Sequence, residues 1–134
     1  METTTKQGSA QLILELFNLR REEKMRKARD WFFQFTPHSM EDLSKVYEGD
    51  SAYFRMIIGY WEMAAALVNH GAIDESMFLD TNGEFLFVFV KVQPYLKEVR
   101  MRQPNFCVQL EKLIMRIPDA QKKLDAIKAM FVKK

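Results

Sequence analysis

Apolar residues recur along this chain at the spacing of one face of an α-helix, and this spacing limits the fold more than any other feature of the sequence. The broadest apolar stripe lies between residues 50 and 71: Phe54, Ile57, Ile58, Trp61, Ala65 and Val68. Five glycines and four prolines in 134 residues are too few for a β-sandwich, whose short strands need frequent turn residues. We therefore predict an all-α protein, a single compact bundle of five to six helices.

The segment FLFVFVKV, residues 85–92, fits a buried strand as well as a helix, because periodicity cannot decide so short an apolar run. Thr81 and Glu84 have the spacing of a capping box, which opens a helix, and no second strand-like segment exists to pair with this one. Apolar residues also continue at helical spacing as far as Val99. We predict a helix that Pro94 kinks, since proline removes a backbone donor.

The segment LVNHGAIDE, residues 67–75, gathers a histidine, a glycine and two acidic residues, as a metal site might. A metal site needs at least three converging ligands, and the local spacing offers at most His70, Asp74 and Glu75. Gly71 stands where a helix ends in a left-handed residue, and Asp74 can cap the next helix. We interpret the segment as a helix boundary, and Ser39 as a further N-cap.

The N-terminal part predicts a disordered segment over residues 1–8, followed by a single helical domain over residues 9–134 whose first helix runs from Ser9 to about Phe35. The apolar residues 12–19 are too few to span a bilayer, which needs roughly 20 apolar residues, and they include Glu15. One cysteine cannot form an internal disulfide, so a reducing compartment is expected. We expect a cytoplasmic protein with no transmembrane segment.

A candidate interface lies in this first helix, where the charged segment RREEK separates its apolar residues from the next apolar stripe. If the first half projects from the core, five apolar residues are exposed in a monomer: Leu12, Ile13, Leu16, Phe17 and Leu19. A homodimer or a peripheral membrane contact would bury them. The alternative, that this segment packs on the protein's own helices, stays open at this point.

Glu62 is a candidate member of a buried ion pair, because it is the only charged residue between Arg55 and His70. A partly buried carboxylate requires a partner, since burying an unpaired charge is costly. We predict that Glu62 pairs with Arg100, with Arg55 as the second candidate.

Recognisable catalytic motifs are missing from the sequence. Cys107 lies in an apolar segment with no histidine nearby, and no glycine-rich phosphate loop or nucleophile elbow is present. The basic run near residue 24 is interrupted by Glu22, Glu23 and Asp30, and the net charge is only +2, which argues against nucleic-acid binding. We expect a protein without catalytic activity, cofactor or metal, which acts through protein contacts and associates with itself. The alternative is a nucleic-acid or membrane-surface binder that uses the basic first helix.

The block YWEMAAALVNHGAIDESMFLD, followed by PYLKEVR and NFCVQLEKL, resembles an uncharacterised bacterial family of small all-helical proteins of unknown function. The residues that carry the resemblance lie in the middle half of the chain: Glu62, Gly71, Ile73, Asp74, Arg100, Phe106 and Glu111. The resemblance implies a helical fold and assigns no activity. Some members of the family carry a membrane-spanning N-terminal helix, which this chain lacks.

Overall fold

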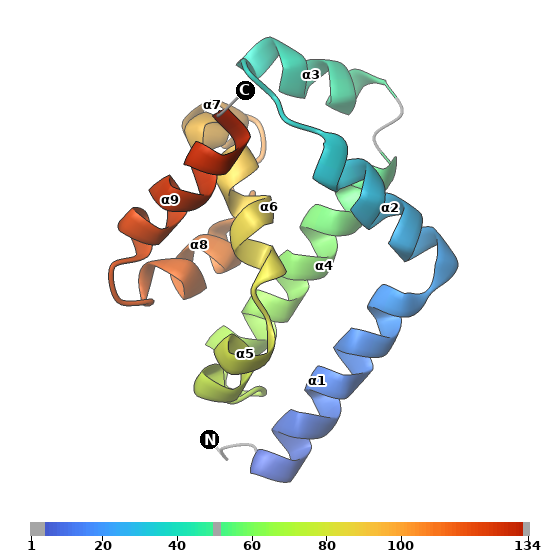
Figure 1. Cartoon of the computed structure of the whole chain (residues 1–134), viewed down its shortest axis with the longest axis vertical. Coiled ribbons are helices and arrows are strands. Elements are labelled where there is room, and N and C mark those ends of the chain that lie inside the picture. Colours follow the sequence, from blue (N-terminus) through green and yellow to red (C-terminus); the bar gives the residue numbers. More distant parts are fainter. Residues whose placement is uncertain (1–4, 50–51, 133–134) are drawn as a thin grey trace.

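The computed structural model describes residues 5–49 and 52–132, and within them all regular secondary structure is helical (Figure 1). The elements in chain order are α1 (Lys6–Arg21), α2 (Glu23–Gln34), α3 (Met40–Glu48), α4 (Ala52–Asn69), α5 (Glu75–Thr81), α6 (Glu84–Val92), the 3₁₀ turn η1 (Gln93–Tyr95), α7 (Leu96–Val99), α8 (Val108–Met115) and α9 (Ala120–Val132). The all-α class is confirmed. The described part of the chain contains nine α-helical segments, so the prediction of five to six helices was too low.

The helix predicted from Ser9 to Phe35 begins earlier and is broken in two. Thr5 caps α1, and its hydroxyl accepts a hydrogen bond from the Gly8 N–H at 3.0 Å. The predicted disordered segment was therefore wrong for residues 5–8, while residues 1–4 lie outside the described residues. The break falls at Glu22, which is extended and whose carboxylate accepts the N–H of Met25 at 3.1 Å to cap α2.

The helix boundary predicted over residues 67–75 is confirmed. Gly71 has φ 84°, a left-handed conformation that glycine adopts without strain. Its N–H donates to the Val68 carbonyl at 3.0 Å, and the Ala72 N–H donates to the Leu67 carbonyl at 2.9 Å, which closes the end of α4. Asp74 then caps α5 by accepting the Met77 N–H at 2.9 Å. The cap predicted at Ser39 is confirmed in the same way at the start of α3.

The segment FLFVFVKV is helical, as predicted, but the signal that led to this prediction was wrong. Thr81 is the last residue of α5, and its hydroxyl donates to the Met77 carbonyl at 2.8 Å. The N-cap of α6 is Gly83, which makes no side-chain capping bond. Pro94 does not kink a continuous helix, because α6 ends at Val92 and the chain passes through η1 before α7 begins.

Helix α4 lies at the centre of the molecule and packs against α2, α5, α6 and α8 (Figure 1). Its apolar stripe is buried as predicted, with Phe54 and Trp61 almost fully enclosed. The ring of Phe54 stacks between Phe32 of α2 and Phe106, which precedes α8, so aromatic contacts join three parts of the chain. Helix α9 packs on α6, on the side of the molecule opposite α1 (Figure 1).

Two glycines of the α4 region should respond to alanine in opposite directions. Gly71→Ala places a Cβ on a left-handed residue and should destabilise the fold by about 1 kcal/mol. Gly59→Ala lies inside α4 with no atom within 4 Å of the added Cβ, and should stabilise it by about 0.5–1 kcal/mol. Urea unfolding of both variants tests this, and equal signs would contradict the assigned backbone conformations.

Candidate functional site

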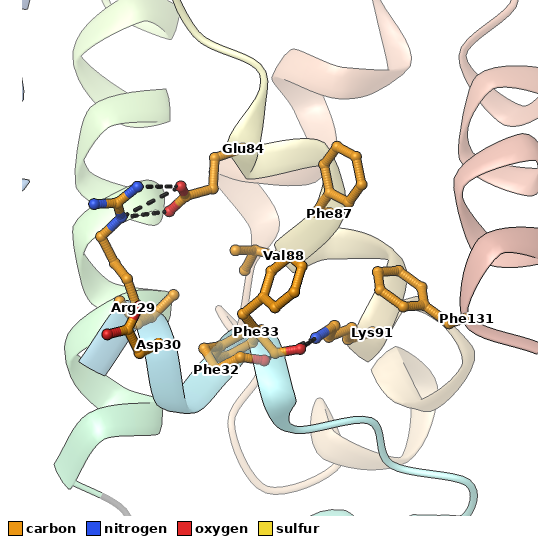
Figure 2. Close-up of a pocket in the computed structure, with 10 residues that line it drawn as sticks. Arg29, Asp30, Phe32, Phe33, Glu84, Phe87, Val88, Lys91 and Phe131 are labelled. Carbon is orange, nitrogen blue, oxygen red and sulfur yellow. Dashed lines mark hydrogen bonds and ion pairs between the residues drawn. The ribbon is translucent and has the colours of Figure 1, made fainter. Parts of the chain in front are cut away.

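A cleft lined by aromatic residues lies between α2, α6 and α9 (Figure 2). We call it the aromatic cleft and define it by Phe33 of α2, Phe87 and Lys91 of α6, and Phe131 of α9. It encloses a cavity of about 140 Å³. Figure 2 shows the pair formed by Arg29 and Glu84 on one side of the cleft and Phe131 on the other.

The sequence of α2 and α6 explains why these side chains meet. Phe32 points into the core, so Phe33, one residue further along the helix, points outward and is 67% exposed. Phe87 and Lys91 are four residues apart and therefore share one face of α6. The ring of Phe87 meets the ring of Phe131 edge to face, with centroids 6.2 Å apart.

Lys91 is a buried ammonium that joins α6 to the end of α2. Its side chain is 5% exposed, and its Nζ donates to the carbonyl oxygens of Phe32 at 2.7 Å and Phe33 at 2.9 Å. These carbonyls lie in the last turn of α2, where helix oxygens lack intrahelical donors and positive charge is favoured. The Nζ also lies 4.8 Å from the centre of the Phe131 ring. Burial lowers the pKa of Lys91 to about 8.

Arg29 and Glu84 form the polar edge of the cleft. The guanidinium donates from Nε to Oε2 at 3.0 Å and from Nη2 to Oε1 at 2.7 Å, which ties α2 to the first turn of α6. Both side chains are about 30% exposed, so the pair contributes at most about 1 kcal/mol to stability. Asp30 lines the same cavity and is exposed to solvent. With Lys91, the cleft therefore carries two groups of each charge.

The predicted pair of Glu62 with Arg100 is wrong. Both carboxylate oxygens of Glu62 accept backbone N–H groups at the start of α8, from Gln109 and Leu110, at 2.9 Å each. A helix N-terminus favours a negative charge, so it serves as the partner that the buried carboxylate requires. Arg100 instead pairs with Glu111 at 2.9 Å and donates to the Phe106 carbonyl at 2.9 Å.

The predicted interface on the first helix is wrong as a set. Ile13 and Leu16 belong to the protein's own core, and Leu12 is half-buried, because α1 packs on α2 and α5. Two polar bonds hold this packing: the Tyr60 hydroxyl donates to the Leu16 carbonyl, and the Ser9 hydroxyl accepts the Asp74 N–H at 2.9 Å. The remaining two predicted residues, Phe17 and Leu19, are exposed, and so is Leu14.

The other polar residues singled out in the sequence lie apart from one another. Cys107 is buried, and burial raises the pKa of its thiol far above the usual range. His38 and His70 are exposed. Within the described part of the chain, no three His, Cys, Asp or Glu side chains come close enough to share a metal ion.

Sequence reasoning missed Lys91 and its surroundings. One signal was available, since Lys91 is the only charged residue between Glu84 and Lys97 and lies in a helix of apolar residues. A lone charge in such a setting indicates a buried group with a specific partner. The sequence gave no comparable signal for Phe33, which looks like any other core aromatic of α2.

Replacing the carboxylate of Glu62 should loosen α8. Glu62→Gln keeps the shape of the side chain but turns one acceptor into a donor that faces a backbone N–H, so we expect a loss of about 2 kcal/mol in urea unfolding. Glu48→Gln, at an exposed position, should change stability by less than about 0.5 kcal/mol. Equal effects of the two substitutions would contradict the role given to Glu62.

Stability should rise with pH as Lys91 loses its proton. The pKa of Lys91 is about 8 when folded and 10.5 as a free side chain, so the unfolded state binds more protons between these values. The desolvation cost is fully present below pH 8 and disappears by pH 10.5, a gain of about 2 kcal/mol. Urea unfolding of wild type and Lys91→Met across this range measures it. Parallel pH profiles of the two proteins would refute the prediction.

None of the described helices has the length and apolar character needed to cross a membrane. No curated protein and no solved structure matches the chain. A family model does match it over residues 7–117, which includes Phe33, Phe87 and Lys91 and leaves out α9. The match confirms the resemblance to an uncharacterised family of helical proteins. The chain belongs to the family described as domain of unknown function (DUF4760).

Proposed function

We propose that this protein acts without catalysis, through contacts with another protein chain, and that the chain it contacts is a second copy of itself. The proposed contact surface is the aromatic cleft. The observation that carries the proposal is that an exposed phenylalanine and a cavity of matching size lie on the same patch.

The size of the cavity favours a single apolar side chain as its occupant. Cavities of about 150 Å³ lined by apolar side chains bind benzene, and the cleft encloses about 140 Å³. Pockets for drug-sized ligands are larger, about 300–1,000 Å³. The ring of a phenylalanine, such as Phe33, therefore has the right volume for this cavity.

A two-fold dimer requires a patch that is complementary to itself, because each copy presents the same surface to the other. Phe33 protrudes beside the cavity, so one patch supplies both the inserted group and the space that receives it. The charges fit as well. Arg29 and Lys91 are positive while Asp30 and Glu84 are negative, so two facing patches need not repel each other.

The absence of catalysis is proposed from the partners of the groups with reactive chemistry. Both oxygens of Glu62 are engaged by backbone N–H groups, so this carboxylate is held as a helix cap. The thiol of Cys107 is enclosed and its pKa is raised, which disfavours the nucleophilic thiolate.

Sedimentation equilibrium of wild type and Phe33→Ser tests the proposal. Wild type should show twice the chain mass of 15.9 kDa at tens of micromolar, and Phe33→Ser should sediment as the monomer because it removes the inserted ring. The variant should remain folded, since Phe33 is 67% exposed.

Leu14→Ser is the matched control, because Leu14 is exposed to a similar degree on α1. It should leave the dimer intact. A dimer lost in Leu14→Ser and kept in Phe33→Ser would place the interface on the first helix instead. A monomeric wild type at all concentrations would refute self-association.

A further inference from the structure

A second cavity, of about 210 Å³, lies beside the aromatic cleft. It is bounded by residues 36–38, the end of α6, η1 and α9. Lys91 and Phe131 line both cavities and so form the wall between them.

The ionisable groups of this second cavity are unusual for a chain whose net charge is only +2. Two lysines and a histidine line it, namely Lys91, Lys128 and His38, and no described acidic residue does. The nearest acidic groups act elsewhere. Asp42 accepts the backbone N–H of His38 at 2.9 Å, and Asp42 and Glu98 help to raise the pKa of Tyr95. The cavity is therefore a site of local positive charge.

The hydrogen bonds of Lys91 leave room for an anion. An ammonium has three N–H donors, and two of these go to the Phe32 and Phe33 carbonyls. Among the described residues no carboxylate lies within ion-pair distance of Nζ, although the side chain is 5% exposed. A buried cation without a counter-ion is costly, and a bound carboxylate would offset that cost.

The rest of the lining is apolar. Val90, Pro94 and Phe131 present hydrocarbon or aromatic surface to the same space. A ligand that matches both parts has one negative group and a small apolar body. At 210 Å³ the cavity exceeds the roughly 150 Å³ that holds benzene by about the room needed for one carboxylate.

We propose that this cavity binds a small monocarboxylate with an apolar body of about one aromatic ring, its carboxylate accepting hydrogen bonds from Lys91 and Lys128. The apolar body then contacts Val90, Pro94 and Phe131. This site is independent of the proposed self-association, because Phe33 does not line it.

Calorimetric titration of the full chain with benzoate tests the proposal, and benzamide serves as a neutral molecule of the same shape. Benzoate should bind with one-to-one stoichiometry, and benzamide should bind at least roughly tenfold more weakly because it lacks the charge. No binding of benzoate at millimolar concentration, or equal binding of the two molecules, would overturn the proposal.

Lys128→Met identifies the site, because Lys128 is exposed and its loss should not affect folding. It should weaken benzoate binding roughly tenfold. The matched control is Lys122→Met, an exposed lysine of the same helix that does not line the cavity, and it should bind as wild type does. Equal losses in both variants would reduce the effect to general charge and refute the site. Phe33→Ser should bind benzoate normally whether or not it dimerises.

Discussion

The bond between the Lys91 ammonium and the last carbonyls of α2 holds together the part of the fold on which both cavities depend. It fixes α6 against the end of α2 and brings the ring of Phe131 against the same nitrogen. The end of a helix leaves oxygens without donors, and a buried lysine without an acidic partner needs acceptors, so each satisfies the other. Each cavity lies against this junction, and its shape follows from it.

The polar residues that carry the family resemblance serve the helix arrangement. Glu62 caps α8, Asp74 caps α5, and Gly71 ends α4 in a left-handed conformation. Arg100 holds Glu111 and the backbone before α8. These contacts explain why such residues stand at these spacings without requiring a reaction centre. Function is then left to groups that the resemblance does not include, above all Lys91 and the exposed ring of Phe33.

Local signals in the sequence predicted local structure well, and signals that depended on distant residues failed. The end of α4 and the caps at Ser39 and Asp74 use partners within a few residues, so spacing alone revealed them. The spacing of Thr81 and Glu84 was equally suggestive, but Glu84 binds Arg29, 55 residues away. Glu62 was correctly expected to need a partner. Its partner is a helix N-terminus, and backbone groups cannot be recognised from residue types. The cavities were unpredictable for the same reason, since three distant helices form them.

Helix α9 lies beyond the part of the chain that matches the family model, yet it supplies Phe131 to both cavities and Lys128 to the second. The junction of α2 with α6 lies inside the matched part. The scaffold common to the family and the wall that selects an occupant are thus encoded in separate stretches of sequence. Relatives whose chains diverge after position 117 would keep the buried amine and present it to a differently shaped space, so that binding preference could change between members while the fold stays the same.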